Sequence, residues 1–231
     1  MHLRILVWDL PTRVFHWSLA ASFAVAFLTA ESERYRDVHV LAGYLLLALI
    51  GFRLVWGLVG SRHARFASFI RGPAAVIGYL RSLLTAKPEH HVGHNPAGAV
   101  AIVLLLALAT LTGLTGWLNF NEVGGEVFEE LHEGLAHAML IVVGVHVLGV
   151  IVASRLHREN LARAMIDGYK RGPREQGIAR RHGMMALLLV AGVGVFGWSL
   201  ARGSLPSLLD RTAAAAEKTD SRHDQHRGHD G

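Results

Sequence analysis

The sequence predicts an all-α integral membrane protein: a bundle of four transmembrane helices, followed by a fifth, C-terminal transmembrane helix. Five apolar segments carry this prediction, because each is close to the roughly 20 residues that a helix needs to span about 30 Å of hydrocarbon. They are residues 14–30, 38–59, 97–118, 131–153 and 184–201. The composition agrees, since 52% of the residues are hydrophobic and the 25 glycines suit closely packed membrane helices.

The segments divide the chain into three regions. Residues 1–171 hold the four-helix domain, residues 172–201 form a linker and the fifth helix, and residues 202–231 form a polar tail rich in histidine. The tail contains His223, His226 and His229 and is typical of a disordered segment. A His-rich tract is also able to bind zinc, copper or nickel, so that alternative stays open.

The charges of the connecting segments predict the orientation. Lys and Arg outnumber acidic residues in the stretches 60–96 and 154–183, whereas 119–131 has four glutamates and no basic residue. By the positive-inside rule, we expect the N-terminus on the cytoplasmic side of the membrane and the C-terminus on the outer side. This topology accounts for the net charge of +5, which we therefore do not interpret as nucleic-acid binding.

An amphipathic stretch lies in the first of these predicted cytoplasmic loops, between the second and third apolar segments. Residues 64–84, ARFASFIRGPAAVIGYLRSLL, interleave Arg with aromatic and aliphatic residues and are broken at Gly72–Pro73. They predict one or two short helices in the inner membrane interface, with Arg toward phosphates and the apolar side chains toward acyl chains. Coverage by another subunit is an equal alternative.

Histidine is the one strong transition-metal ligand that the composition leaves. The chain has 15 His and no Cys, which excludes Cys-bound iron–sulfur clusters, Cys-based zinc sites and Cys nucleophiles. It also shows no nucleotide-binding Gly-rich loop and no Ser–His–Asp arrangement.

Four histidines fall at two matched depths in the predicted helices. His132 and His146 are 14 residues apart, which is about 21 Å along a helix and only about 40° around its axis. His39 begins the second helix at the outer side and pairs in depth with His132, while His16 pairs with His146 toward the inside. Two pairs of opposed imidazoles in a helical bundle are what bis-histidine ligation of two haems requires. A single histidine at a helix end is also typical of a polar anchor.

Two more residues bear on this hypothesis. Arg53 lies 14 residues after His39 and so shares its helix face, at the depth of the inner pair, where a guanidinium can bind a haem propionate. A snorkelling arginine at the membrane boundary is an equal alternative. His137 is rotated away from the stripe of His132 and His146, so it is not expected to bind haem. The histidines of HHVGHNP are interpreted as loop or anchor residues.

The chain resembles the bacterial cytochrome b561 and nickel-hydrogenase b-type cytochrome family. The matching stretches include VWDLPTRVFHWSL (7–19), the block RLVWGLVG, GHNPAGA (93–99) and LHEGLAHAMLIVVGVHVLGV (131–150). The resemblance covers residues 3–170 and implies a four-helix bundle with His16, His39, His132 and His146 as axial ligands of two haems b. It does not extend to the fifth helix or the tail.

The predicted function is electron transfer across the membrane. Two haems with both axial positions filled would move electrons between the quinone pool and a redox partner in a respiratory chain. That partner is a periplasmic cytochrome c, which the acidic outer loop suits, or a docked hydrogenase-type enzyme. Quinol oxidation or quinone reduction by the chain itself is left open. The alternatives from other classes are a metal-cation transporter and a non-redox membrane anchor.

Overall fold

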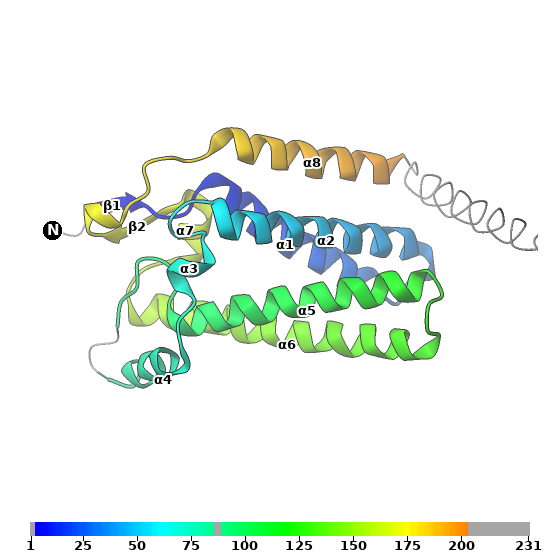
Figure 1. Cartoon of the computed structure of the whole chain (residues 1–231), viewed down its shortest axis with the longest axis horizontal. Coiled ribbons are helices and arrows are strands. Elements are labelled where there is room, and N and C mark those ends of the chain that lie inside the picture. Colours follow the sequence, from blue (N-terminus) through cyan, green and yellow to red (C-terminus); the bar gives the residue numbers. More distant parts are fainter. Residues whose placement is uncertain (1–2, 86–88, 203–231) are drawn as a thin grey trace, which may run out of the picture.

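The structure is a computed structural model, and it describes residues 3–85 and 89–202. Four long helices run side by side: α1 (Leu10–Thr29), α2 (Arg36–Val59), α5 (Pro96–Phe120) and α6 (Glu126–Leu156). Figure 1 shows them as two layers, α1 with α2 and α5 with α6. A shorter apolar helix, α8 (Gly183–Ala201), lies along α1 and α2. All five predicted apolar segments are therefore helical.

The helices begin where local chemistry favours a start. The carboxylate of Asp9 accepts a hydrogen bond from the backbone N–H of Thr12 at 2.8 Å, and Pro11 follows in the first turn of α1. In the same way, the side chain of Asn95 accepts from the N–H of Gly98 at 2.7 Å, with Pro96 opening α5. These caps satisfy donors that a helix N-terminus otherwise leaves free.

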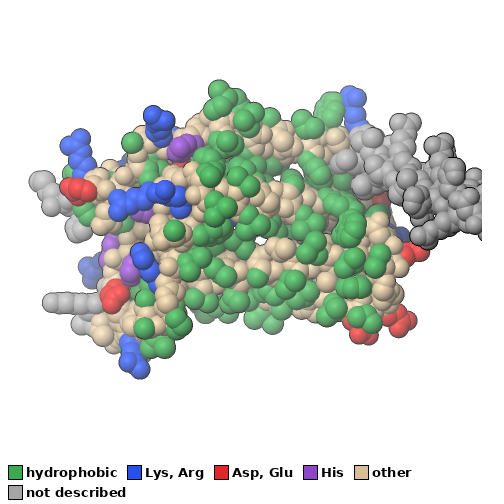
Figure 2. Space-filling model, in the orientation of Figure 1, with side chains coloured by type: hydrophobic (Ala, Val, Ile, Leu, Met, Phe, Trp, Pro, Cys, Tyr) green, Lys and Arg blue, Asp and Glu red, His purple; other side chains and the backbone are tan. Residues whose placement is uncertain are grey.

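The two helix pairs meet through a small apolar core at mid-bundle. Leu46 and Ile50 of α2 pack there with Ala109 of α5 and Met139 of α6. Many large apolar side chains on the outside of the bundle are exposed, as Figure 2 shows. This pattern suits a protein whose surroundings are lipid rather than water.

Within residues 3–85 and 89–202, three helical segments are long and apolar enough to cross a membrane: Glu33–Val59, Pro96–Phe120 and Glu126–Leu156. The chain is thus a multi-pass membrane protein with a helical fold. The first of these segments includes η1 (Glu33–Tyr35), a short turn before α2. Membrane crossing by α1 and α8, which would complete the predicted four-plus-one arrangement, stays a prediction.

One end of the bundle carries a small folded cap that the prediction of an all-α fold missed. Strand β1 (Leu3–Leu6) pairs antiparallel with β2 (Tyr169–Gly172), in a register that places Leu3 opposite Gly172. The ladder contacts α7 (Leu161–Asp167) and η2 (Arg174–Gln176), while at the same end of the bundle α3 (Phe66–Phe69) contacts α2 and α4 (Pro73–Ser82) contacts α5. The expected pair of short helices in residues 64–84 is confirmed by α3 and α4, with Pro73 opening the second.

We call the end with this cap the basic end. The opposite end, with the α1–α2 and α5–α6 connections, is called the acidic end. In Figure 2 the Lys and Arg side chains gather mainly at the basic end, and acidic side chains gather where α5 and α6 connect.

Within the cap, Nζ of Lys170 lies 3.4 Å from Oε2 of Glu159, with side-chain exposures of 4% and 13%. The ladder extends to Gly172, one residue beyond the predicted domain boundary at residue 171. The N–H of Ile178 also donates to the carbonyl of Leu6 at 2.8 Å, so residues on both sides of that boundary bond to β1. The His-rich tail from residue 203 lies outside the described residues.

Candidate functional site

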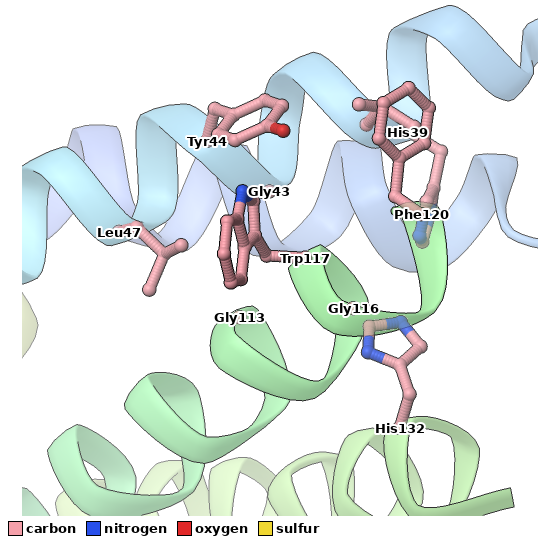
Figure 3. A pocket seen from close by; sticks show the side chains of 10 residues that line it. His39, Gly43, Tyr44, Leu47, Gly113, Gly116, Trp117, Phe120 and His132 are labelled. Atoms are coloured by element: carbon pink, nitrogen blue, oxygen red, sulfur yellow. The ribbon is translucent and has the colours of Figure 1, made fainter. Parts of the chain in front are cut away.

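Two histidines face each other at the acidic end, in a pocket between α2, α5 and α6. The ring centroids of His39 on α2 and His132 on α6 are 5.9 Å apart, with an interplanar angle of 83°. Tyr44, Leu47 and Trp117 are among the residues that line the pocket, and Figure 3 shows these side chains to one side of the two histidines. The structure therefore brings together the pair that the sequence places at the outer depth.

A backbone carbonyl of a neighbouring helix holds each of these imidazoles. Nδ1 of His39 lies 2.8 Å from the carbonyl oxygen of Ala26 near the end of α1, and Nδ1 of His132 lies 2.8 Å from that of Thr112 in α5. A carbonyl oxygen only accepts hydrogen bonds, so Nδ1 carries the proton in both rings. In a neutral imidazole this leaves the lone pair of Nε2 available to a metal, as in most metal-binding histidines.

A glycine makes room for the imidazole of His132 at this pocket. A Cβ on Gly116 would lie 2.7 Å from Cε1 of His132, which is too close for a real contact, so glycine permits the ring to approach α5. Gly43 lines the same pocket from α2, and a Cβ there would meet nothing within 4 Å. The segment TLTGLTGW (residues 110–117) of α5 supplies this wall of the pocket and the Thr112 carbonyl.

The second predicted pair, His16 and His146, lies nearer to the basic end. Both side chains are half-buried, on α1 and α6, and they are close enough to interact electrostatically. The ring of His16 meets Trp17 edge-on at 5.0 Å, and its Nδ1 is buried without a hydrogen-bond partner among the described residues. Buried polar atoms are nearly always hydrogen-bonded, so the Nδ1 atom of His16 indicates that a further group binds near the inner pair.

Arg53 is enclosed by protein near the inner pair. It is 3% exposed, Nη2 donates to the carbonyl of Ala64 at 2.9 Å, and the guanidinium lies over the ring of Phe66 at 4.6 Å. A snorkelling arginine would expose its head group, whereas protein encloses this guanidinium. Nη1 is buried and has no partner in the described part of the chain, so it is available to an anion.

A buried carboxylate that the sequence analysis did not assign balances this charge. Asp9 is fully buried, interacts electrostatically with Arg53, and accepts a hydrogen bond from Nε1 of Trp56 at 3.1 Å. Together with its bond to Thr12, this contact fixes the start of α1 against the end of α2. The Asp–Leu–Pro sequence is a recognisable helix-start signal, but nothing local indicates the contacts with α2.

A further histidine that was not predicted for the site lies beside Arg53. The ring centroid of His94, just before α5, is 4.5 Å from both Trp8 and Phe69. Its Nδ1 is buried without a described partner, and the ring lies within electrostatic range of Arg53 and His146. Burial, and then the positive charge of Arg53, lowers the pKa of His94 to about 3, so the ring is neutral at physiological pH.

His137 lies apart from both pairs, in agreement with the sequence analysis. It is exposed, its Nδ1 lies 3.0 Å from the carbonyl oxygen of Glu133, and its ring edge meets Phe27 at 6.1 Å. Within residues 3–85 and 89–202, no group of three or more His, Asp or Glu side chains is placed to hold a bare metal ion. A transporter site therefore finds no support in that part of the chain.

The side chains present do fit a haem. An iron already held by four porphyrin nitrogens needs two axial ligands, and each pair offers two imidazoles from facing helices. With metal–imidazole bonds of about 2 Å, the two ring centroids would stand roughly 6 Å apart. The observed separation in the outer pair is 5.9 Å.

Comparison with known proteins gives a consistent result. Residues 7–168 match the family model described as prokaryotic cytochrome b561. A probable Ni/Fe-hydrogenase B-type cytochrome subunit of Rhizobium leguminosarum bv. viciae is 24% identical over 211 residues, covering 71% of this chain and 87% of the relative. A protein with the same description from Azotobacter chroococcum mcd 1 is 27% identical over 152 residues, covering 53% and 62%. No solved structure matches the chain significantly.

Proposed function

The chain belongs to the prokaryotic cytochrome b561 family, a family of membrane b-type cytochromes in electron transfer, and on that premise we propose that it binds two haems b and carries electrons across a bacterial inner membrane. His39 and His132 hold the outer haem, and His16 and His146 hold the inner haem. Arg53 binds a propionate of the inner haem. The electrons pass between the quinone pool and a redox partner at the outer face.

The outer pair carries this proposal. Its two imidazoles come from different helices, face each other at 5.9 Å, and are each held through Nδ1 by a carbonyl of a third or fourth helix. Such fixed rings need no rearrangement to present Nε2 to an iron, and outer hydrogen bonds of this kind raise the affinity of histidine for metal. A pair of surface anchors would have no reason to be oriented in this way.

The residues of the chain contribute to electron transfer by orienting the haem ligands and by excluding water. A haem with two axial imidazoles supplies reversible one-electron transfer and leaves no coordination position for oxygen or substrate. The carbonyls of Ala26 and Thr112 orient the axial rings, while the apolar lining of the pocket keeps water away. His132 and His146 are about 21 Å apart along α6, so the two sites span most of the roughly 30 Å of hydrocarbon.

The proposed topology follows from the separation of charge. With the basic end in the cytoplasm and α1, α2, α5, α6 and α8 all crossing the membrane, the N-terminus is cytoplasmic and the C-terminus periplasmic. The outer haem then lies beside the acidic rim, a set of exposed side chains that consists of Glu122, Glu126, Glu129 and Glu130. These residues face the periplasm, where partner proteins dock.

Two partners have a specific observation in their favour. Relatives are described as hydrogenase subunits, which favours a docked hydrogenase-type enzyme. The acidic rim favours a partner with a basic face, such as a small cytochrome c, because complementary charge raises encounter rates. Either partner would exchange electrons with the outer haem, and the quinone pool would exchange them with the chain within the membrane.

Haem content in single variants tests the proposal. The purified chain should give a b-type spectrum, and the pyridine haemochrome assay should report two haems in the wild type and one each in His39→Ala and His16→Ala. His137→Ala is the matched control and should keep two, because its side chain lies outside both pairs. Two haems in His39→Ala would remove the outer site from the proposal, and loss of a haem in His137→Ala would mean that the ligand face is wrongly chosen.

A further inference from the structure

Two buried polar atoms without partners belong to side chains that both pack on α3: the guanidinium of Arg53 on Phe66, and the ring of His94 on Phe69. They are Nη1 of Arg53 and Nδ1 of His94, and neither has a partner among the described residues. Arg53 is the charged group that acts most strongly on His94, and His146 acts on the same ring. His94 therefore lies within electrostatic range of both Arg53 and a proposed axial ligand of the inner haem.

The surrounding protein does not satisfy these donors, although it holds both side chains firmly. Nη2 of Arg53 is bonded to Ala64, and the two carboxylate oxygens of Asp9 are occupied by Thr12 and by Trp56. His94 is packed between two aromatic rings, which fix its orientation. The two side chains meet through α3, since the rings of Phe66 and Phe69 are 5.9 Å apart. A guanidinium N–H, and an imidazole N–H in the tautomer with the proton on Nδ1, suit an acceptor with two oxygens, which is a carboxylate.

We propose that His94 and Arg53 bind one propionate carboxylate of the inner haem together, with His94 donating from Nδ1 and Arg53 from Nη1. The proposal rests on the function proposed above and adds His94, from the loop before α5, to the residues that hold the haem. It gives a reason for a buried guanidinium that Asp9 compensates only in part. It also predicts that this pair sets the potential of the inner haem, because an uncompensated carboxylate opposes the addition of an electron to the nearby iron.

Three variants separate this role from a purely structural one. His94→Leu removes the donor, whereas His94→Asn keeps an N–H close to the position of Nδ1. His91→Leu is the matched control from the same loop; the His91 ring lies against Tyr79, away from the inner pair. Each protein is titrated by spectroelectrochemistry, and infrared difference spectra are recorded with haem that carries ¹³C in its propionate carboxyl groups.

The expected result is specific to one haem. His94→Leu should lower the potential of the haem that is lost in His16→Ala by up to a tenfold change in its reduction constant, which is about 59 mV for one electron. It should also shift a ¹³C carboxylate band. His94→Asn should restore most of both properties, and His91→Leu should leave them unchanged.

Other outcomes would overturn the proposal. Unchanged potentials and carboxylate bands in a His94→Leu protein that still holds two haems would show that His94 does not touch the propionate, while leaving the dihaem function intact. A shift that appears only when quinone is added would assign the two donors to a quinone instead. Reconstitution of the wild type with haem dimethyl ester needs no variant: the inner site should bind the ester more weakly than haem, and equal affinity would overturn the proposal. A wild type without an inner haem would end the dihaem function as well.

Discussion

Replacing Gly116 by alanine should damage the outer haem site through a single methyl group. The new Cβ would lie 2.7 Å from Cε1 and 2.8 Å from Nδ1 of His132, against 3.4 Å or more in ordinary contacts. The ring would have to retreat by roughly 0.7 Å, which would stretch its hydrogen bond to the Thr112 carbonyl toward about 3.5 Å, the limit for such a bond. That bond is 2.8 Å long in the structure.

The loss can be expressed as an affinity. Removing an outer hydrogen bond from a metal-binding histidine lowers metal affinity about 10- to 100-fold, or roughly 1.4 to 2.7 kcal/mol. Haem titration of the apoprotein, followed by absorbance, should show this weakening at one of two sites. Gly51→Ala on α2 is the control, since a Cβ there would meet nothing within 4 Å and both substitutions share the general gain of helix propensity. Full outer-site affinity in Gly116→Ala would refute the reasoning, because the His132 ring would then not depend on its position against α5.

Three other perturbations have defined outcomes. Lys170→Met removes the cationic partner of the half-buried Glu159 carboxylate, which keeps a hydrogen bond from the N–H of Arg171, and should lower the free energy of unfolding by about 2 kcal/mol in thermal or denaturant unfolding. The double variant with Glu159→Gln should recover most of this loss, and a Lys170→Met protein as stable as the wild type would deny the pair a role in the cap. Truncation after Ile178 keeps the β1–β2 ladder and every proposed ligand, so the shortened chain should still hold two haems; loss of haem would make α8 a structural member of the bundle. Gln at all four positions of the acidic rim should leave the haem spectrum unchanged but slow oxidation by a basic partner, most at low salt; rates that are unaltered across a salt series would favour a partner that docks through apolar contacts.

The helices and the histidine pairs could be predicted from the sequence because they follow from simple periodicities. A span needs about 20 apolar residues, and a separation of 14 residues returns a helix nearly to the same face, which is enough to place His132 and His146 on one stripe. The depth of each histidine in its span then pairs it with a partner. The structure brings His39 and His132 together as expected and puts His16 within range of His146.

The features that were missed depend on contacts between distant segments. The strands β1 and β2 have four residues each and lie at opposite ends of the domain, so neither shows a pattern of its own. The carbonyls that hold the outer imidazoles are backbone atoms, which every residue has and no sequence pattern marks. His94 resembles a loop residue until the fold packs it between Trp8 and Phe69.

Low-temperature electron paramagnetic resonance of the oxidised, purified chain tests the central claim most directly. Two haems that each have two axial imidazoles should give two low-spin ferric signals whose integrated intensity corresponds to two spins per chain. A single low-spin signal of one spin per chain would contradict the dihaem account. A high-spin signal of comparable intensity would contradict it as well, because it would mean that an axial position is open and that one of the histidine pairs does not ligate iron.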